Sequence, residues 1–147
     1  MANQRNNQNQ SQENWKLRKD EVRRWIQDGF EDETINYTDA FGKFLVGARL
    51  TTSQIRNIFG EVKRLQGATQ GQADLSAVRK DFLMLRPKLA YAAKRAGSRG
   101  IESLKEVMDV ALKAVETTGP KAKDQFENFV DFFEAILAYH KAYGGRD

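Results

Sequence analysis

Few side chains in this sequence belong to the types that carry out catalysis. It has no cysteine and a single histidine, His140, which excludes thiol nucleophiles, disulfides, iron–sulfur clusters and cysteine-based zinc sites. His140 falls at the centre of the apolar stripe of the last predicted helix, where we expect a hydrogen-bonded core residue. No glycine-rich phosphate-binding loop of the Walker or dinucleotide type occurs. We therefore predict no enzyme, no catalytic residue, no metal site, no cofactor and no small-molecule substrate.

A row of four carboxylates recurs along the last predicted helix, on the face opposite its apolar stripe. Paired carboxylates can bind Mg²⁺ or act as general acids and bases, but a row on one exposed helical face is more often solvated surface. A contact with basic side chains of another copy of the chain is a further possibility, which we keep as a tentative subunit contact. The row consists of Asp124, Glu127, Asp131 and Glu134.

Basic side chains are concentrated in the middle of the chain. The 147 residues contain 24 Lys and Arg against 20 Asp and Glu. Residues 43–99 hold twelve of the basic residues and only three acids, whereas the segments on both sides have a net negative charge. A central segment of this charge between acidic flanks indicates a surface that faces a polyanion.

Seven of these bases occur on two predicted helices, where we predict contacts with an RNA backbone. On the first helix three of them share one flank away from the apolar stripe, Glu61 points elsewhere, and Gly60 lets a sugar–phosphate strand come close. Thr52 and Ser53 lie at that helix's N-terminus, whose free N–H groups attract phosphate. On the second helix Tyr91 is interleaved with cations, as in sites that stack on a base. The predicted RNA-binding residues are Arg56, Lys63, Arg64, Arg86, Lys88, Lys94 and Arg95.

The elements that must position these side chains are helices, because apolar residues recur with helical spacing almost everywhere and no segment alternates with period two. The sequence predicts an all-α, compact bundle of five to six helices. One long helix after Asp74 contains Pro87, which should produce a kink or a junction of two helices. The other expected helices are 15–29, one from Thr38 after an acidic linker at 31–33, one opened by a capping box at Thr51, one over 101–115, and one from Pro120 to 143.

The first 14 residues differ in composition from the rest of the chain. Residues 1–14 contain nine Asn or Gln and no large apolar residue after Met1, so we predict a disordered tail followed by a single helical-bundle domain at 15–147. No run of 18 apolar residues and no apolar signal segment occurs, so we expect a cytoplasmic protein with no membrane contact.

The segment from Phe41 to Arg64 also resembles a helix-turn-helix, with a short turn before polar residues that open the second helix. The main alternative function is therefore a dimeric regulator that reads duplex DNA. A helical adaptor that contacts only proteins is a third possibility.

Three blocks, Leu50–Arg56, Arg86–Arg95 and Phe129–Lys141, are similar to the signature blocks of one family and occur in the family's order. This family is the small subunit of type III-A (Csm) CRISPR–Cas effector complexes, and the similarity spans about residues 34–144. The resemblance implies a small helical protein of antiviral defence that binds guide and target RNA without cleaving it. It implies that several copies stack as an inner filament beside the backbone subunits and the large signature subunit.

Overall fold

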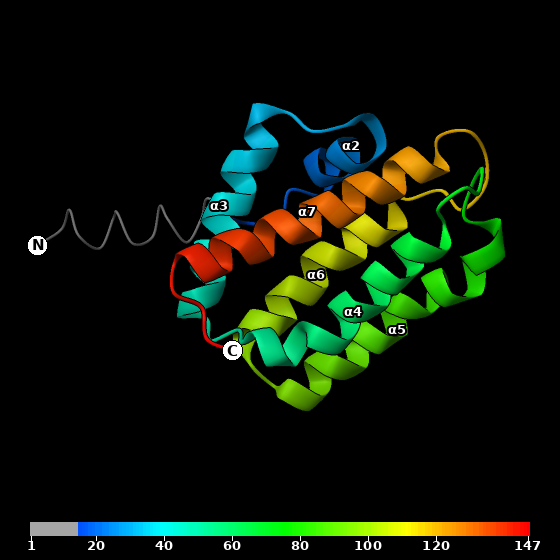
Figure 1. Cartoon of the computed structure of the whole chain (residues 1–147). Helices are drawn as coiled ribbons and strands as arrows, with labels where there is room; N and C mark the ends of the chain where they lie inside the picture. Colours follow the sequence, from blue (N-terminus) through cyan, green and yellow to red (C-terminus); the bar gives the residue numbers. More distant parts are fainter. Residues whose placement is uncertain (1–14) are drawn as a thin grey trace, which may run out of the picture.

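The computed structural model describes residues 15–147, and within this range the chain is helical with no strand (Figure 1). This confirms the all-α prediction. The tail predicted for residues 1–14 lies outside the described residues. The six α-helices are α2 (Lys19–Asp28), α3 (Asp32–Gly47), α4 (Thr52–Ala68), α5 (Arg79–Ala96), α6 (Arg99–Lys113) and α7 (Ala122–Ala142), with a 3₁₀ turn η1 (Ser76–Val78) before α5.

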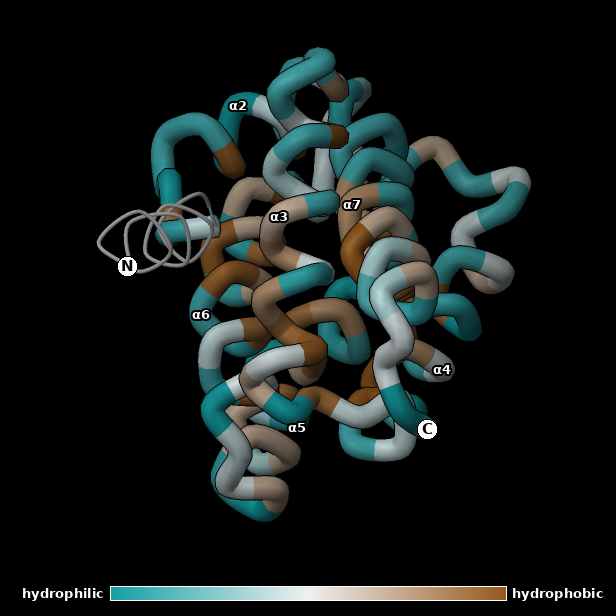
Figure 2. The backbone as a smooth tube through the Cα atoms, turned by 90° about the vertical axis from the view of Figure 1, so that its left-hand side faces the viewer, coloured by the Kyte–Doolittle hydropathy of each residue, from teal (hydrophilic) through white to brown (hydrophobic). Residues whose placement is uncertain are grey.

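The helices form a compact bundle in which α6 and α7 lie between two pairs. Helices α2 and α3 pack on α7 at one side, and α4 and α5 lie side by side at the other, with α5 also packed on α6 (Figure 1). The hydrophobic stretches of α3, α6 and α7 lie toward the middle of the bundle (Figure 2). This layout leaves the outer faces of α4 and α5, the two helices that carry the seven predicted RNA-binding residues, free of any other helix among those described.

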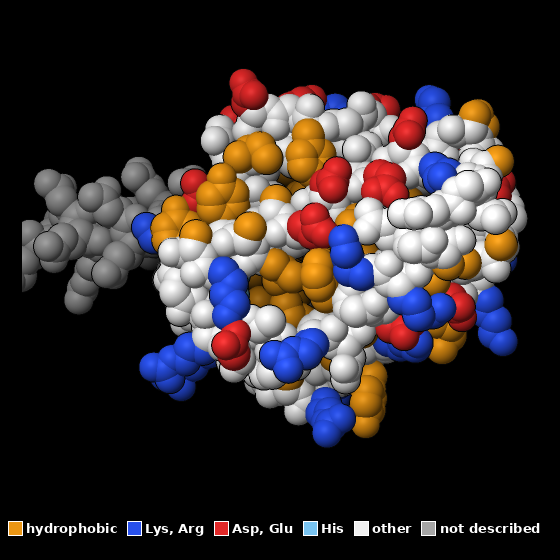
Figure 3. Space-filling model, in the orientation of Figure 1, with side chains coloured by type: hydrophobic (Ala, Val, Ile, Leu, Met, Phe, Trp, Pro, Cys, Tyr) orange, Lys and Arg blue, Asp and Glu red, His pale blue; other side chains and the backbone are white. Residues whose placement is uncertain are grey.

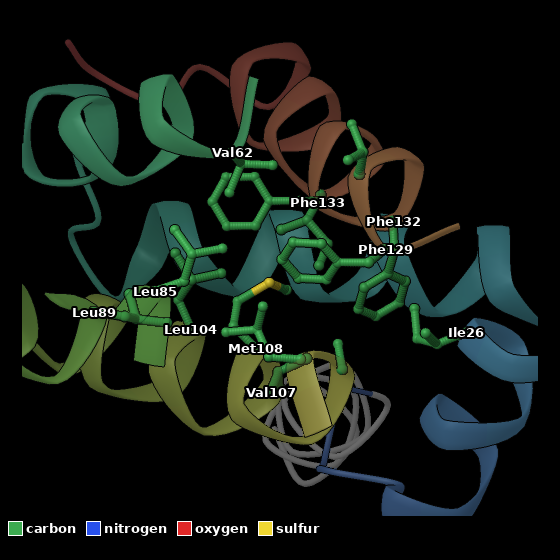
Figure 4. Close-up of a cluster of buried hydrophobic side chains, with 14 of the residues drawn as sticks. Ile26, Val62, Leu85, Leu89, Leu104, Val107, Met108, Phe129, Phe132 and Phe133 are labelled. Carbon is green, nitrogen blue, oxygen red and sulfur yellow. The ribbon is translucent and has the colours of Figure 1, made fainter. Parts of the chain in front are cut away.

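The core is built from the apolar stripes that the helical spacing predicts. Phe129 and Phe133 of α7 and Met108 of α6 meet in the centre, with Val62 of α4 and Leu85 of α5 beside them (Figure 4). All five side chains are at most 1% exposed. Burial of apolar surface on this scale is the main force that holds the helices together, because isolated helices of this length are marginal in water.

Helix α3 begins earlier than predicted, so the prediction of an acidic linker over residues 31–33 is wrong. Glu31 is the N-cap of α3 and forms a capping box with Thr34, whose hydroxyl accepts the Glu31 N–H at 2.9 Å. Asp32 and Glu33 follow in the first turn, where carboxylates interact favourably with the helix dipole. Thr38, the predicted cap, lies inside the helix and is buried.

Three other helix boundaries differ from the predictions. Asp74 does not cap α5 but accepts the N–H of Ser76 at 2.9 Å in front of η1, and α5 begins at Arg79. The chain remains in one helix through Pro87, so the alternative of two helices meeting near Leu85 is wrong. Helix α7 starts two residues after Pro120, and α2 starts at Lys19 rather than at Trp15, whose ring instead stacks on Phe41 and Phe44 of α3.

Helix α3 crosses α7 at close range at Gly42. A Cβ atom added to Gly42 would lie 2.6 Å from Cβ of Tyr139, 2.9 Å from the backbone N of His140 and 3.0 Å from the carbonyl oxygen of Ile136. These atoms belong to the α7 backbone or are bonded directly to it and cannot move aside. The sequence marks Gly42 only as a residue that weakens a helix, whereas the structure gives it a packing role.

The single histidine is a core residue, as predicted. His140 is 1% exposed, and its Nε2 lies 2.7 Å from the carbonyl oxygen of Leu50. Gly145 covers the ring so closely that a Cβ there would lie 2.1 Å from Cε1 of His140. The imidazole therefore joins the end of α7 to the loop between α3 and α4 and has no access to a substrate.

Candidate nucleic-acid interface

The N-terminus of α4 has the local structure that its sequence predicts, but its polar groups already have partners. Thr51 and Gln54 form the expected capping box. The N–H of Thr52 donates to the carbonyl oxygen of Arg146 at 2.9 Å, so a segment near the C-terminus covers this end of the helix. A phosphate at the N-terminus of α4, or base contacts from Thr52 and Gln54 in a helix-turn-helix, would have to displace these bonds.

The side of α4 that faces α7 contacts two carboxylates of that helix. Nζ of Lys63 lies 2.7 Å from Oε1 of Glu134, and Nε2 of Gln66 donates to Glu127 at 2.7 Å. Figure 3 shows the acidic side chains gathered over α7 with a Lys or Arg side chain beside them. Two of the four carboxylates in the predicted acidic row therefore contact α4 within the chain.

Asp131 lies between these two carboxylates on the same helix. Partial burial raises its pKa above the usual range, and the negative charges of Glu134 and Glu127 raise it further, while Lys63 acts in the opposite direction. Asp131 and Asp124 form neither an ion pair nor a side-chain hydrogen bond within residues 15–147, whereas Glu134 has Lys63 and Glu127 has the amide of Gln66. These two carboxylates, Asp131 and Asp124, therefore have no bonded partner in that range, and both are exposed.

The side of α4 that faces α5 holds a second network, centred on Glu61. The guanidinium of Arg64 lies 3.0 Å from Glu61 and 3.4 Å from Asp81 of α5, and Nζ of Lys88 lies 3.6 Å from Glu61. The hydrogen bond from Arg64 lowers the pKa of Glu61 below its usual range, with smaller contributions from the charges of Arg64 and Lys88. Glu61 keeps its negative charge, because neighbouring cations stabilise the ionised carboxylate.

The structure corrects the predicted positions of the cations on α4. Lys63 extends toward α7 and Arg64 toward α5, so they lie on opposite sides of the helix rather than on one flank. Glu61 does not point elsewhere but pairs with two predicted RNA-binding residues, Arg64 and Lys88. Arg56 lies near enough to Asp147 to lower the pKa of that carboxyl, after the larger effect of Lys141.

Four of the seven predicted cations form no ion pair in the described range: Arg56 of α4, which lies near Asp147, and three residues of α5. Arg86, Lys94 and Arg95 are exposed on α5, and none of them forms an ion pair within the part of the chain that the structure describes. Lys94 and Arg95 occupy the last turn of α5, where cations interact favourably with the helix dipole. These three side chains are therefore the most available to an external anion.

A groove of about 890 Å³ runs between the first half of α4 and the second half of α5. Lys88, Tyr91 and Arg95 line it from α5, and Asn57 lines it from α4. Tyr91 is 69% exposed, the largest exposure among the large hydrophobic side chains described. Along the lower edge of Figure 3, basic and hydrophobic side chains stand out side by side over α5. The groove brings together Lys88, Tyr91 and Arg95, three of the residues singled out in the sequence.

Sequence reasoning missed a second basic region, at the end of the bundle where α3 stops and α6 starts. Lys43, Arg49 and Arg99 line a pocket of about 440 Å³ there. Aromatic rings hold two of these cations: Nζ of Lys43 lies 5.7 Å from the ring centre of Tyr143, and the guanidinium of Arg99 lies 5.4 Å from that of Phe44. The charge count over residues 43–99 includes all three, but only the fold brings these separate segments together.

Comparison with known families now identifies the chain. A model of the family described as Csm2 Type III-A matches residues 30–146. The chain belongs to this family. Csm2 is the small subunit of type III-A CRISPR complexes and a structural component of them, which confirms the resemblance found in the three sequence blocks. The matched region begins at the end of the α2–α3 loop, so α2 lies outside it. No curated protein matches the chain significantly.

Two other kinds of site are absent from the described residues of this Csm2 subunit. Between residues 15 and 147 no helix is both long and apolar enough to cross a bilayer. In the same range no three His, Asp or Glu side chains converge as metal ligands do. The exposed basic surface of α4 and α5 is therefore the strongest candidate site.

Proposed function

We propose that this Csm2 subunit binds single-stranded RNA without cleaving it, within the type III-A complex. The RNA is the guide and its target, and the partners are other copies of the subunit, the backbone subunits and the large signature subunit. Several copies stack as the inner filament of the ribonucleoprotein, in the cytoplasm, as part of antiviral defence. The family membership and the basic outer faces of α4 and α5 support this proposal.

The observation that carries the RNA-binding part is the set of exposed, unpaired cations on α5. Arg86, Lys94 and Arg95 have no carboxylate to neutralise them among the described residues. Cations that form no ion pair in the folded chain remain free to replace the counterions of a phosphate backbone. Lys63, Arg64 and Lys88 are paired, so they reach RNA only by exchanging a carboxylate for a phosphate.

Contacts of this kind suit a subunit that does not choose the sequence. Hydrogen bonds and ion pairs to phosphate fix the position of a strand but carry no information about its bases. In a guide-directed complex the base pairs between guide and target supply that information. The subunit then needs only to hold the backbone in place.

The test is the salt dependence of binding to a single-stranded RNA of mixed sequence, measured by fluorescence anisotropy. If one copy contacts about four phosphates, the slope of log K against log salt is about −3, at ~0.7 per phosphate. Replacing both Lys94 and Arg95 with Ala should make the slope shallower by about 1.4 and weaken binding equally for unrelated sequences. A random duplex DNA should bind no better than the RNA.

Lys121→Ala combined with Lys123→Ala is the matched control, because it removes the same charge from the acidic third of the chain. This control should keep the wild-type slope. Equal losses in the two double variants would show that only net charge matters and would contradict an RNA site on α5. Preference for one duplex sequence would instead favour the helix-turn-helix regulator.

The acidic row of α7 belongs to the filament part of the proposal. Asp124 and Asp131 are the free carboxylates of the row, whereas Glu127 and Glu134 contact α4 of the same chain. We assign the contact with the next copy to these two free side chains. Stacking head to tail requires two different complementary patches on each copy, and the basic side chains Lys43, Arg49 and Arg99 supply the second.

A further inference from the structure

Helix α5 has a second stripe of side chains that the core does not use. Met84, Lys88, Tyr91 and Arg95 follow one another at spacings of four, three and four residues, so they share one face of the helix. The buried stripe of Phe82, Leu85 and Leu89 faces the bundle. Met84 is 43% exposed and Tyr91 69% exposed on the outer stripe, and both line the α4–α5 groove.

The groups around Tyr91 have unused binding capacity. The ring stacks on no other aromatic ring and lies under no cation within residues 15–147. The amide of Asn57, across the groove on α4, forms no hydrogen bond in this range, and Arg95 forms no ion pair. Lys88 forms an ion pair with Glu61 at 3.6 Å, and Glu61 itself lines the groove, so Lys88 meets a phosphate by exchanging this carboxylate. An aromatic face, an amide and the unpaired guanidinium of Arg95 thus open into one groove, beside the Lys88–Glu61 ion pair.

This combination fits a nucleotide better than a protein helix. A docked amphipathic helix needs a mainly apolar groove, whereas half of the residues that line this groove are polar or charged, and Tyr91 stands between Lys88 and Arg95. A base offers a flat face to the ring and donors and acceptors to the amide, and its phosphates suit the cations on either side. The charge complementarity therefore favours nucleic acid.

We propose that the α4–α5 groove is a subsite for one unpaired nucleotide. Its base stacks on Tyr91 with an edge toward Asn57, and Lys88 and Arg95 contact the phosphates on the two sides. The inference rests on the proposed RNA-binding function and adds to it the stacking of a base on Tyr91, a contact that does not depend on charge. Stacking on an aromatic ring accepts any base, so the subsite holds a strand without reading it.

The experiment uses the full chain and a short oligouridine that carries one 2-aminopurine, whose fluorescence reports stacking. Tyr91→Ala should weaken binding about tenfold and abolish the fluorescence change on binding, with the salt slope unaltered because no charge is removed. Tyr91→Phe should behave as wild type, since the ring is kept. Tyr91 is largely exposed, so its removal should leave the thermal unfolding of the protein almost unchanged.

Leu83→Ala is the matched control, because Leu83 lies on the same helix, is 42% exposed and does not line the groove. This variant should bind and report as wild type does. Equal affinity and equal fluorescence for Tyr91→Ala and wild type would overturn the subsite while leaving the salt-dependent RNA binding in place. A second result would also overturn the subsite. If Tyr91→Ala binds RNA as wild type does but fails to assemble with other subunits, the groove is a protein contact. No salt-dependent binding by the wild type would reject both proposals.

Discussion

Two helix pairs in this protein meet in opposite ways. Where α3 crosses α7, Gly42 brings the backbones so close that no side chain fits between them, and the neighbouring apolar side chains are buried. Where α4 lies beside α5, an open groove of about 890 Å³ remains, with Tyr91 standing free in it. Both pairs belong to one bundle, but only between α3 and α7 do atoms of the chain itself fill the space between the helices.

The α3–α7 contact contributes to the stability of the fold, whereas the α4–α5 surface is suited to recognition. Close packing of α3 on α7 gains dispersion and hydrophobic energy that open contacts do not provide. The α4–α5 surface gives up part of that energy and keeps cations, an aromatic ring and polar side chains in water. Substitutions at the first contact should therefore act on folding, and substitutions at the second should act on binding with little effect on folding.

The largest expected effect is that of Gly42→Ala. The added methyl group meets the backbone of α7 at less than 3 Å, so the helices must separate, at a cost of about 3 kcal/mol. For a chain of this size the melting temperature should fall by roughly 6–12 °C. Thermal unfolding followed by circular dichroism measures the change, and a melting temperature within a degree of wild type would show that α3 and α7 do not pack this closely.

Gly60→Ala is the counterpart of Gly42→Ala on α4, because it is the same substitution at a position with open space around it. Apart from the backbone of its own helix, nothing lies within 4 Å of the added Cβ, and alanine favours the helix by about 0.5–1 kcal/mol. The variant should therefore be more stable than wild type in urea unfolding. If an RNA strand passes over this surface, the same variant should bind RNA more weakly in the anisotropy assay, so stability and affinity should change in opposite directions.

The smallest effect concerns the pH dependence of stability through Asp131. Its pKa is raised in the folded protein by partial burial and by two neighbouring carboxylates, so ionisation of this group opposes folding. The cost is fully present above the raised pKa and disappears as the pH falls through it toward the ordinary value of the unfolded chain. Asp131→Asn should thus be more stable at pH 7, by less than about 0.5 kcal/mol because the group is exposed. The gain should disappear near pH 3, and a gain that grows as the pH falls would contradict the assignment.

Much of the fold follows from local patterns that the sequence displays. The apolar stripe Ile55, Ile58, Val62 and Leu65 is buried as predicted, and so is the lone histidine. The misplaced boundaries arose where two cues compete. Glu31–Glu33 has the polarity of a linker, but Glu31 with Thr34 satisfies the first N–H groups of a helix, and a satisfied helix end outweighs polarity.

The candidate site was predictable in composition but not in arrangement. The density of bases over residues 43–99 and the interleaving of Tyr91 with cations are visible in the chain. Helical angles alone placed Lys63 and Arg64 together, because they ignore how far a long side chain reaches toward a neighbouring helix. Their carboxylate partners Glu134 and Asp81 are distant in sequence, so only the packed structure shows which cations are neutralised.

The helical class, the absence of cysteine chemistry, the family and the identity of the basic segment follow from the sequence alone, since all of these depend on residue types and short spacings. The packing of the helices is needed to show that Gly42 is a contact point, that Arg86, Lys94 and Arg95 remain unpaired, and that a groove opens beside Tyr91. Those properties depend on distances between side chains far apart along the chain. Such distances are fixed when the apolar faces of all the helices are buried together.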